Sequence, residues 1–159
     1  MPSIRRWAVF GHKITQSLAW VPPLVTRVVI GLGLHFTGHG KLMNLDRATS
    51  FFGSLGIPFP HASAIFVAML EFIGGLCLIL GFGTRIFSFL LSCTLLVAVL
   101  TADLGDFAKK FPADLTDVTS LVYLMFLLWL LFYGAGVVSV DYLIARRLKL
   151  GEPRDNEGV

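Results

Sequence analysis

Four long apolar runs, separated by polar segments, set the pattern of the chain. They cover about Pro22–Gly40, Ala62–Phe82, Ile86–Ala102 and Ser120–Gly136. Each run is close to the roughly 20 apolar residues that a helix needs to cross a bilayer. No segment between them alternates apolar and polar residues as a barrel strand does, and only helices and closed barrels satisfy every backbone polar group in lipid. The pattern therefore predicts an all-α fold, a four-helix transmembrane bundle.

The segments that flank the bundle differ from it in pattern. Ser3–Trp20 places its apolar residues at roughly helical spacing among basic ones, which predicts an N-terminal amphipathic helix at the membrane surface. We therefore divide the chain into an amphipathic segment (1–21), a membrane domain (22–145) and a charged tail (146–159). Within the membrane domain, Leu45–Leu55 is expected to form a short interfacial helix, and Gly81–Arg85 a tight helical hairpin.

Composition and charge support a membrane location. Hydrophobic residues make up 55% of the 159 positions and charged residues 14%, and the mean hydropathy is +0.78. Lys and Arg are concentrated in the N-terminal arm, the second loop and the tail, and cytoplasmic segments of membrane proteins carry such an excess. Both termini are therefore expected in the cytoplasm. The net charge of +3 favours contact with anionic membrane lipids, and nothing resembles a nucleic-acid-binding module.

Glu71 is the most informative residue, because it lies in the middle of the second apolar run. An ionisable side chain at membrane depth costs several kcal/mol on most scales, so it normally faces a bundle interior and marks a functional route or pocket. Ala64, Ala68, Gly74 and Gly75 form a stripe of small residues around it. Small residues let helix backbones approach closely in lipid, so the stripe predicts that Glu71 faces the bundle.

The partner of Glu71 can be estimated from depth. Counted from the cytoplasmic boundary at about 1.5 Å per residue, Glu71 lies about 16 Å deep, His35 about 18 to 20 Å and Arg27 about 6 to 7 Å. His35 matches Glu71 in height, whereas Arg27 would have to reach upward. Both pairings remain open, and a protonated, neutral Glu71 is a third alternative.

His35 and His39 lie four residues apart, on one face of the first helix. This spacing suits a proton relay, a hydrogen-bonding site for a quinone, or a metal or haem ligand. It equally suits polar residues that only pack between helices. The further donors that a metal would need come at spacings that match no standard zinc motif, so we predict no metal site.

Other polar residues gather at the expected outer mouth of the bundle. Thr101 and Asp103 end the third run, and His39, Lys41 and His61 lie on the same side of the membrane. Together they could line an outward-facing pocket, although solvated helix ends are the simpler interpretation of each one alone. The numerous aromatic residues could line a flat apolar cleft for an isoprenoid quinone, although most are expected in the core and at the interfaces.

Several strings of residues resemble motifs of the DoxX family of bacterial membrane proteins. They are Arg27 with Gly38-His-Gly-Lys41-Leu42, Leu55-Gly-Ile-Pro-Phe-Pro60, the stretch from Glu71 to Arg85, Val97-Ala98 with Thr101-Ala-Asp103, and Gly134 to Asp141. The polar positions that match are Arg27, Lys41, Glu71, Arg85, Thr101, Ser139 and Asp141. One departure is Thr37, where members often have a histidine.

This resemblance implies a four-helix protein of the bacterial inner membrane. The family includes DoxD-like subunits linked to thiosulfate:quinone oxidoreduction, and other members tied to oxidative or thiol stress as membrane partners of redox enzymes. By the same resemblance, Arg85 and Asp141 lie on the cytoplasmic face and are expected to pair, and Ser139 is expected to cap a short C-terminal helix. Gly38, Gly74 and Gly75 are the structural glycines of its motifs.

The leading hypothesis is a membrane subunit of a redox system, linked to the quinone pool or to thiol and sulfur oxidation. Glu71, with His35 or Arg27, would hold or move a proton. The sequence has no flavin or dinucleotide fingerprint, so the redox chemistry must come from a redox-enzyme partner, a bound quinone or a cofactor that leaves no motif in the sequence. The alternatives are a non-enzymatic scaffold that recruits redox enzymes, and a small-solute transporter. A homodimer is expected as well, because four helices leave much small-residue surface for packing.

Overall fold

The computed structural model describes residues 20–103, 118–136 and 138–148. These residues form helices and no strands, which confirms the all-α prediction over this part of the chain. The helices are α2 (Val21–Met43), α3 (Leu45–Ser54), α4 (Pro60–Leu80), α5 (Thr84–Thr101), α7 (Thr119–Tyr133) and α8 (Val140–Arg147). The amphipathic helix expected over Ser3–Trp20 lies almost wholly outside the described residues.

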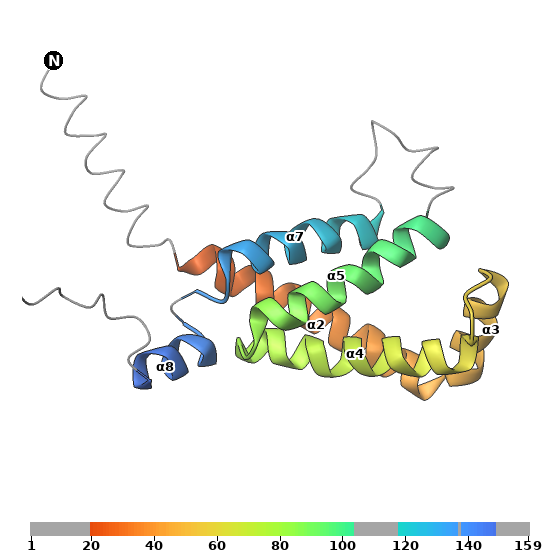
Figure 1. Ribbon diagram of the computed structural model, residues 1–159, viewed down its shortest axis with the longest axis horizontal. Helices are drawn as coiled ribbons and strands as arrows, with labels where there is room; N and C mark the ends of the chain where they lie inside the picture. Colours follow the sequence, from red (N-terminus) through yellow and green to blue (C-terminus); the bar gives the residue numbers. More distant parts are fainter. Residues whose placement is uncertain (1–19, 104–117, 137, 149–159) are drawn as a thin grey trace, which may run out of the picture.

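Four of these helices pack lengthwise, and the two short ones lie at opposite ends (Figure 1). α2 packs along α4, and α5 packs along α7 and α4. The short helix expected at Leu45–Leu55 is confirmed as α3, which folds back onto the start of α4, while its place in the membrane interface stays a prediction. α8 lies at the other end, beside the hairpin between α4 and α5. We call these the α3 end and the α8 end.

Three helices, α2, α4 and α5, are long and apolar enough to cross a membrane. α7 is also apolar but has only 15 residues. The expected fourth span therefore stays a prediction. Many large apolar side chains on the outside of the bundle are exposed, among them Phe36 (68%), Phe66 (61%) and Phe132 (80%). A surface of this kind suits contact with lipid chains.

The hairpin between α4 and α5 depends on two glycines, as expected. Gly81 and Gly83 have φ values of 70° and 57°, a region that residues with a side chain rarely adopt. Asp141 closes the turn, because its carboxylate oxygens accept hydrogen bonds from the backbone N–H groups of Gly83 and Thr84 at 2.7 and 2.9 Å. The expected pair between Arg85 and Asp141 is not among the ion pairs of the described residues. The orphan N–H groups at the start of α5 take the carboxylate instead.

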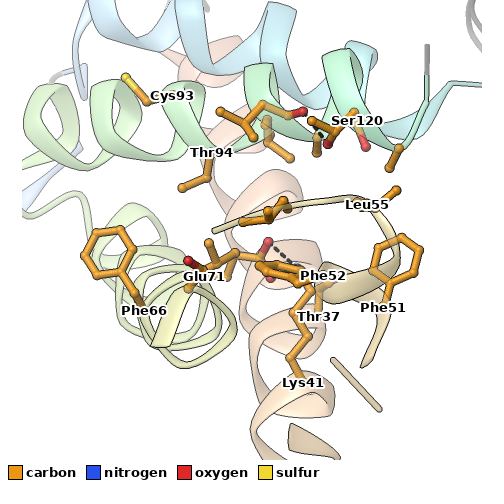
Figure 2. A pocket seen from close by; sticks show the side chains of 18 of the residues that line it. Thr37, Lys41, Phe51, Phe52, Leu55, Phe66, Glu71, Cys93, Thr94 and Ser120 are labelled. Atoms are coloured by element: carbon orange, nitrogen blue, oxygen red, sulfur yellow. Dashed lines mark hydrogen bonds and ion pairs between the residues drawn. The ribbon is translucent and has the colours of Figure 1, made fainter. Parts of the chain in front are cut away.

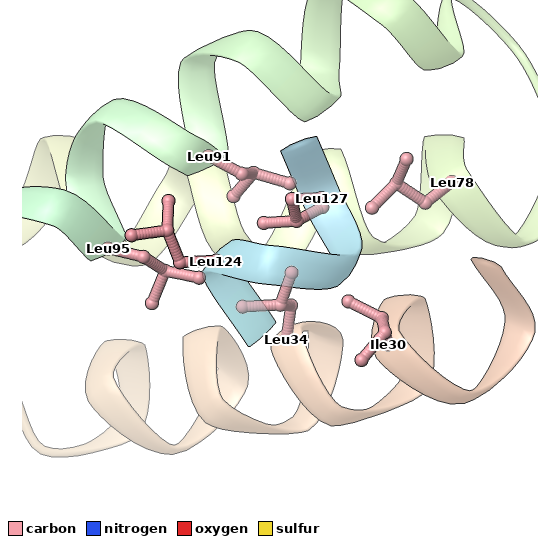
Figure 3. Packing of buried hydrophobic residues seen from close by; sticks show 7 residues of the cluster. All are labelled: Ile30, Leu34, Leu78, Leu91, Leu95, Leu124 and Leu127. Atoms are coloured by element: carbon pink, nitrogen blue, oxygen red, sulfur yellow. The ribbon is translucent and has the colours of Figure 1, made fainter. Parts of the chain in front are cut away.

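The core joins all four long helices. Its buried side chains are Ile30, Leu34, Leu78, Leu91, Leu95, Leu124 and Leu127. Figure 3 shows them converging from α2, α4, α5 and α7. The α2–α4 contact is made by glycines: a Cβ on Gly75 would lie 2.6 Å from the Gly31 carbonyl oxygen, and one on Gly38 would lie 2.7 Å from the Ala68 carbonyl oxygen. This close approach fixes how α4 presents Glu71 to α2.

Candidate functional site

The centre of the candidate site is an ion pair between α2 and α4. Lys41 Nζ donates hydrogen bonds to both carboxylate oxygens of Glu71, at 2.6 and 2.7 Å. Glu71 is only 3% exposed, and Ala68, Gly74 and Gly75 beside it are buried. The prediction that the small-residue stripe turns Glu71 into the bundle is therefore confirmed. The Lys41 side chain is 28% exposed, so the pair connects the interior with a more open space.

The expected partners of Glu71, Arg27 and His35, were wrong. The depth estimate ended the first helix at Gly40 and placed Lys41 in the loop. α2 in fact continues to Met43, and Leu34, Gly38 and Lys41 follow one another at helical spacing on one face. The four-carbon stem of the lysine then lets the ammonium reach back to the carboxylate. This spacing was the sequence signal that could have identified Lys41.

His35 lies at the height of Glu71 but contacts a different group. Its Nδ1 donates a hydrogen bond to the backbone carbonyl oxygen of Phe72 at 3.0 Å. Its ring stacks on the ring of Phe72, with the ring centroids 4.4 Å apart. His35 therefore holds α2 against α4, and it is not bonded to the carboxylate.

Arg27 lies at the α8 end, eight residues before His35 on α2. It is 2% exposed, and its guanidinium donates to two backbone carbonyl oxygens of the segment between α7 and α8. The acceptors are Ala135, at 2.6 Å, and Val138. Arg27 thus ties the start of α2 to that segment. In the same segment Ser139 caps α8 by accepting from the Tyr142 N–H at 3.1 Å, as expected.

A cavity of about 820 Å³ opens beside the ion pair. Lys41, Glu71, Thr101 and Asp103 line it, so the structure brings together four of the residues expected at the site. Figure 2 shows Lys41 and Glu71 on one side of the cavity and α5, with Thr94, on the other. The remaining wall is largely apolar and includes side chains of all four long helices and of α3.

Two of the expected pocket residues lie elsewhere. His39 is exposed, and its ring centroid is 6.2 Å from that of Phe72. His61 is exposed as well, and its Nδ1 lies 3.2 Å from Thr49 Oγ1. Neither lines the cavity.

α3 supplies the part of the cavity wall that sequence reasoning missed. Phe51 and Phe52 line the cavity from this helix, and Leu55 lines it directly after the helix ends. Phe52 and Ala48 are buried against Ala64 of α4, which holds α3 in place. The spacing of apolar residues in α3 indicates that one face of this helix is buried. It does not indicate which other helix packs against that face.

The chemistry that this arrangement offers is specific. The paired charges cancel, so the cavity is an apolar space with ammonium donors and carboxylate acceptors at one place in its wall. Hydroxyl groups of Thr37, Thr94 and Ser120 add weaker hydrogen-bonding sites. A neutral amphiphile with a polar head and an apolar body fits such a lining.

Comparisons with known proteins agree with this membrane-protein architecture. Residues 23–104 match the profile of the DoxX family. The chain is also similar to a Bacillus subtilis (strain 168) protein named "Putative oxidoreductase CatD", with 35% identity over 130 residues, which cover 80% of this chain and 90% of that protein. No solved structure matches the chain significantly.

Proposed function

This chain belongs to the DoxX family, and we propose that it is the membrane-embedded subunit of a redox system that binds a quinone-like molecule beside Lys41 and Glu71. The name of the Bacillus subtilis relative is that of an oxidoreductase, which supports a redox role. In this proposal the redox system exchanges electrons with the quinone pool or takes part in thiol and sulfur oxidation.

One observation carries the proposal: a bidentate, nearly buried ion pair forms part of the wall of an apolar cavity. The wall beside the pair is open to about 820 Å³ of space, which lies within the usual range for small-molecule sites. A quinone ring has carbonyl oxygens that accept hydrogen bonds from an ammonium group, and its isoprenoid chain suits the apolar lining.

Reduction of a quinone to a quinol takes up two electrons and two protons. Glu71, the wall carboxylate that is paired with Lys41, could take up one of these protons and pass it to the quinone, and water would supply the other. Because the sequence has no flavin or dinucleotide fingerprint, the electrons would come from a partner redox enzyme. In this proposal His35 and Arg27 hold the helices in place and do not touch the reacting groups.

We further propose that α2, α4, α5 and α7 all cross the bacterial inner membrane, with both termini in the cytoplasm. α5 and α7 pack along each other, and residues from the end of α5 and the start of α7 line the same cavity. If α5 crosses the membrane, α7 therefore crosses it in the opposite direction, because the two helices lie side by side. The α8 end then faces the cytoplasm, where Lys and Arg are concentrated, and the cavity opens near the outer face.

Quinone binding tests the proposal. The probe is a benzoquinone with a ten-carbon tail, titrated into protein in detergent micelles and measured by calorimetry. Wild-type protein should bind it, and Lys41→Met and Glu71→Gln should each weaken binding about tenfold, the loss expected when a charged hydrogen-bonding group is removed. Asp46→Asn is the matched control, because Asp46 is an exposed acid on α3 that does not line the cavity.

Two results would reject this proposal. The first is an absence of quinone binding to protein whose helical content and thermal transition are intact. The second is equal affinity in wild type, Lys41→Met and Glu71→Gln. If redox-enzyme partners still co-purify with such a protein, the scaffold hypothesis gains support in its place.

A further inference from the structure

A separate pocket lies at the α8 end of the molecule. Its volume is about 410 Å³, and its lining residues come from the α4–α5 hairpin, the end of α7 and the start of α8. Figure 1 shows α8 at this end of the molecule. The residues with functional side chains that line it are Arg85, Tyr133, Ser139, Asp141 and Tyr142. None of its lining residues lines the cavity of Lys41 and Glu71, so the two are distinct sites.

Two polar side chains of this pocket, Asp141 and Ser139, already have partners inside the protein. The Asp141 carboxylate accepts two backbone hydrogen bonds from the start of α5. The Ser139 hydroxyl donates to the Gly136 carbonyl oxygen at 2.8 Å while it caps α8. Arg85 is different: it is exposed, and within the described ranges its guanidinium has neither a hydrogen bond nor an ion pair. Of the two charged side chains in the pocket, the one left to meet a ligand is therefore the cation.

Arg85 lies beside Gly134 at the end of α7. A Cβ at Gly134 would be 3.4 Å from Arg85 Nε and 3.6 Å from Nη2, an ordinary contact distance, so the guanidinium lies next to this turn of the backbone. Arg146 and Arg147, exposed on α8, add positive charge at the same end of the molecule. A guanidinium beside further basic residues recognises phosphate, because its N–H groups match phosphate oxygens in pairs.

An apolar trough of about 430 Å³ adjoins this pocket along α7. Leu128, Trp129, Phe132 and Tyr133 line it, and Tyr133 also lines the Arg85 pocket. The rings of Trp129 and Tyr133 stack with centroids 5.1 Å apart, while Phe132 is 80% exposed. A charged pocket thus continues into an apolar trough that runs toward the middle of the bundle. Free phosphate would use only the first, whereas a lipid would use both.

We propose that the Arg85 pocket and the α7 trough form one binding site for an anionic phospholipid. The phosphate lies at Arg85, and an acyl chain lies along Trp129 and Phe132. Basic pockets between membrane helices on the cytoplasmic side bind anionic headgroups in this way. The inference rests on the membrane placement of α5 and α7 and does not depend on the redox role.

Quenching of Trp129 fluorescence tests this site directly. Trp7→Phe and Trp20→Phe leave Trp129 as the single tryptophan, which is excited selectively, and the protein is placed in mixed vesicles of phosphatidylcholine and phosphatidylglycerol. Bromine on the acyl chains of one lipid or the other then reports which lipid contacts Trp129. We expect brominated phosphatidylglycerol to be favoured about fivefold, the preference that one arginine near a membrane surface provides. Arg85→Gln should remove the preference.

Arg147→Gln is the matched control, because it removes the same charge at the same end of the molecule from a residue outside both pockets. It should leave most of the preference in place. Equal quenching by the two lipids in the wild-type background would overturn the proposal. So would equal losses in Arg85→Gln and Arg147→Gln, which would indicate only a basic surface. If the two lipids quench equally while inorganic phosphate binds the protein and Arg85→Gln abolishes that binding, the site binds free phosphate and the lipid assignment is wrong.

Discussion

At the residue scale, the Lys41–Glu71 pair should show strong energetic coupling. Lys41→Met leaves a carboxylate without its counter-charge in an apolar wall, and Glu71→Leu leaves an ammonium there. Each single change is expected to destabilise the fold by about 3 kcal/mol, because a buried charge loses its partner. The double change should cost clearly less than the sum. Denaturant unfolding in detergent micelles for all four proteins gives the coupling, and strictly additive effects would show that the pair is not formed.

Arg27 is expected to have a purely positional role. Its guanidinium donates to the carbonyl oxygens of Ala135 and Val138 at once, and a lysine ammonium cannot match that fork. Arg27→Lys should therefore release the segment between α7 and α8 almost as fully as Arg27→Met, at a cost of about 2 kcal/mol. Hydrogen exchange of that segment measures the release, and Arg147→Lys is the control. Wild-type protection in Arg27→Lys would show that one contact suffices.

At the element scale, the α2–α4 contact offers a matched pair of glycines. A Cβ on Gly38 would meet the backbone of α4 at Ala68 and Phe72, whereas one on Gly40 would meet nothing within 4 Å. Gly38→Ala should therefore force the helices apart and cost on the order of 1 to 3 kcal/mol. Gly40→Ala should be neutral or stabilise the protein by up to about 1 kcal/mol, because alanine favours helix.

The same pair of variants reports on the site. Forcing α2 away from α4 also moves Lys41 away from Glu71, so Gly38→Ala should weaken quinone binding while Gly40→Ala leaves it intact. Thermal unfolding and the calorimetric titration together separate the two effects. Identical behaviour of the two variants in both measurements would mean that the helices are not in backbone contact.

At the scale of the whole molecule, local pattern predicted the elements but not what they bring together. The runs of apolar residues, the Gly81–Gly83 turn and the Ser139 cap are encoded within a few neighbouring positions. The Glu71 partner was missed because a three-residue error in the end of α2 hid Lys41. The carbonyl oxygens that Arg27 binds, and the position of Phe51 and Phe52 in the cavity wall, depend on contacts between segments far apart in the sequence. The spacing of neighbouring residues carries no information about such contacts.

The crossing of α7 decides the topology of the whole molecule. By helical rise its 15 residues extend about 22 Å, less than the roughly 30 Å of the hydrocarbon core, so the bilayer or the flanking residues must make up the difference. Between α3 and α8 the chain crosses three times if α7 spans and twice if it does not. Asp46→Cys on α3 and Arg147→Cys on α8, each combined with Cys77→Ser and Cys93→Ser, distinguish these cases.

We expect a membrane-impermeant maleimide, added outside intact inner membranes, to label the cysteine at position 46 but not the one at position 147. Permeabilising the membrane should then expose the second position, which controls for its reactivity. The expected asymmetry follows from three crossings, with the cavity of Lys41 and Glu71 near the outer face and the Arg85 pocket at the inner one. Labelling of both positions from the same side would mean that α7 lies on the membrane, and the fourth span would have to be abandoned.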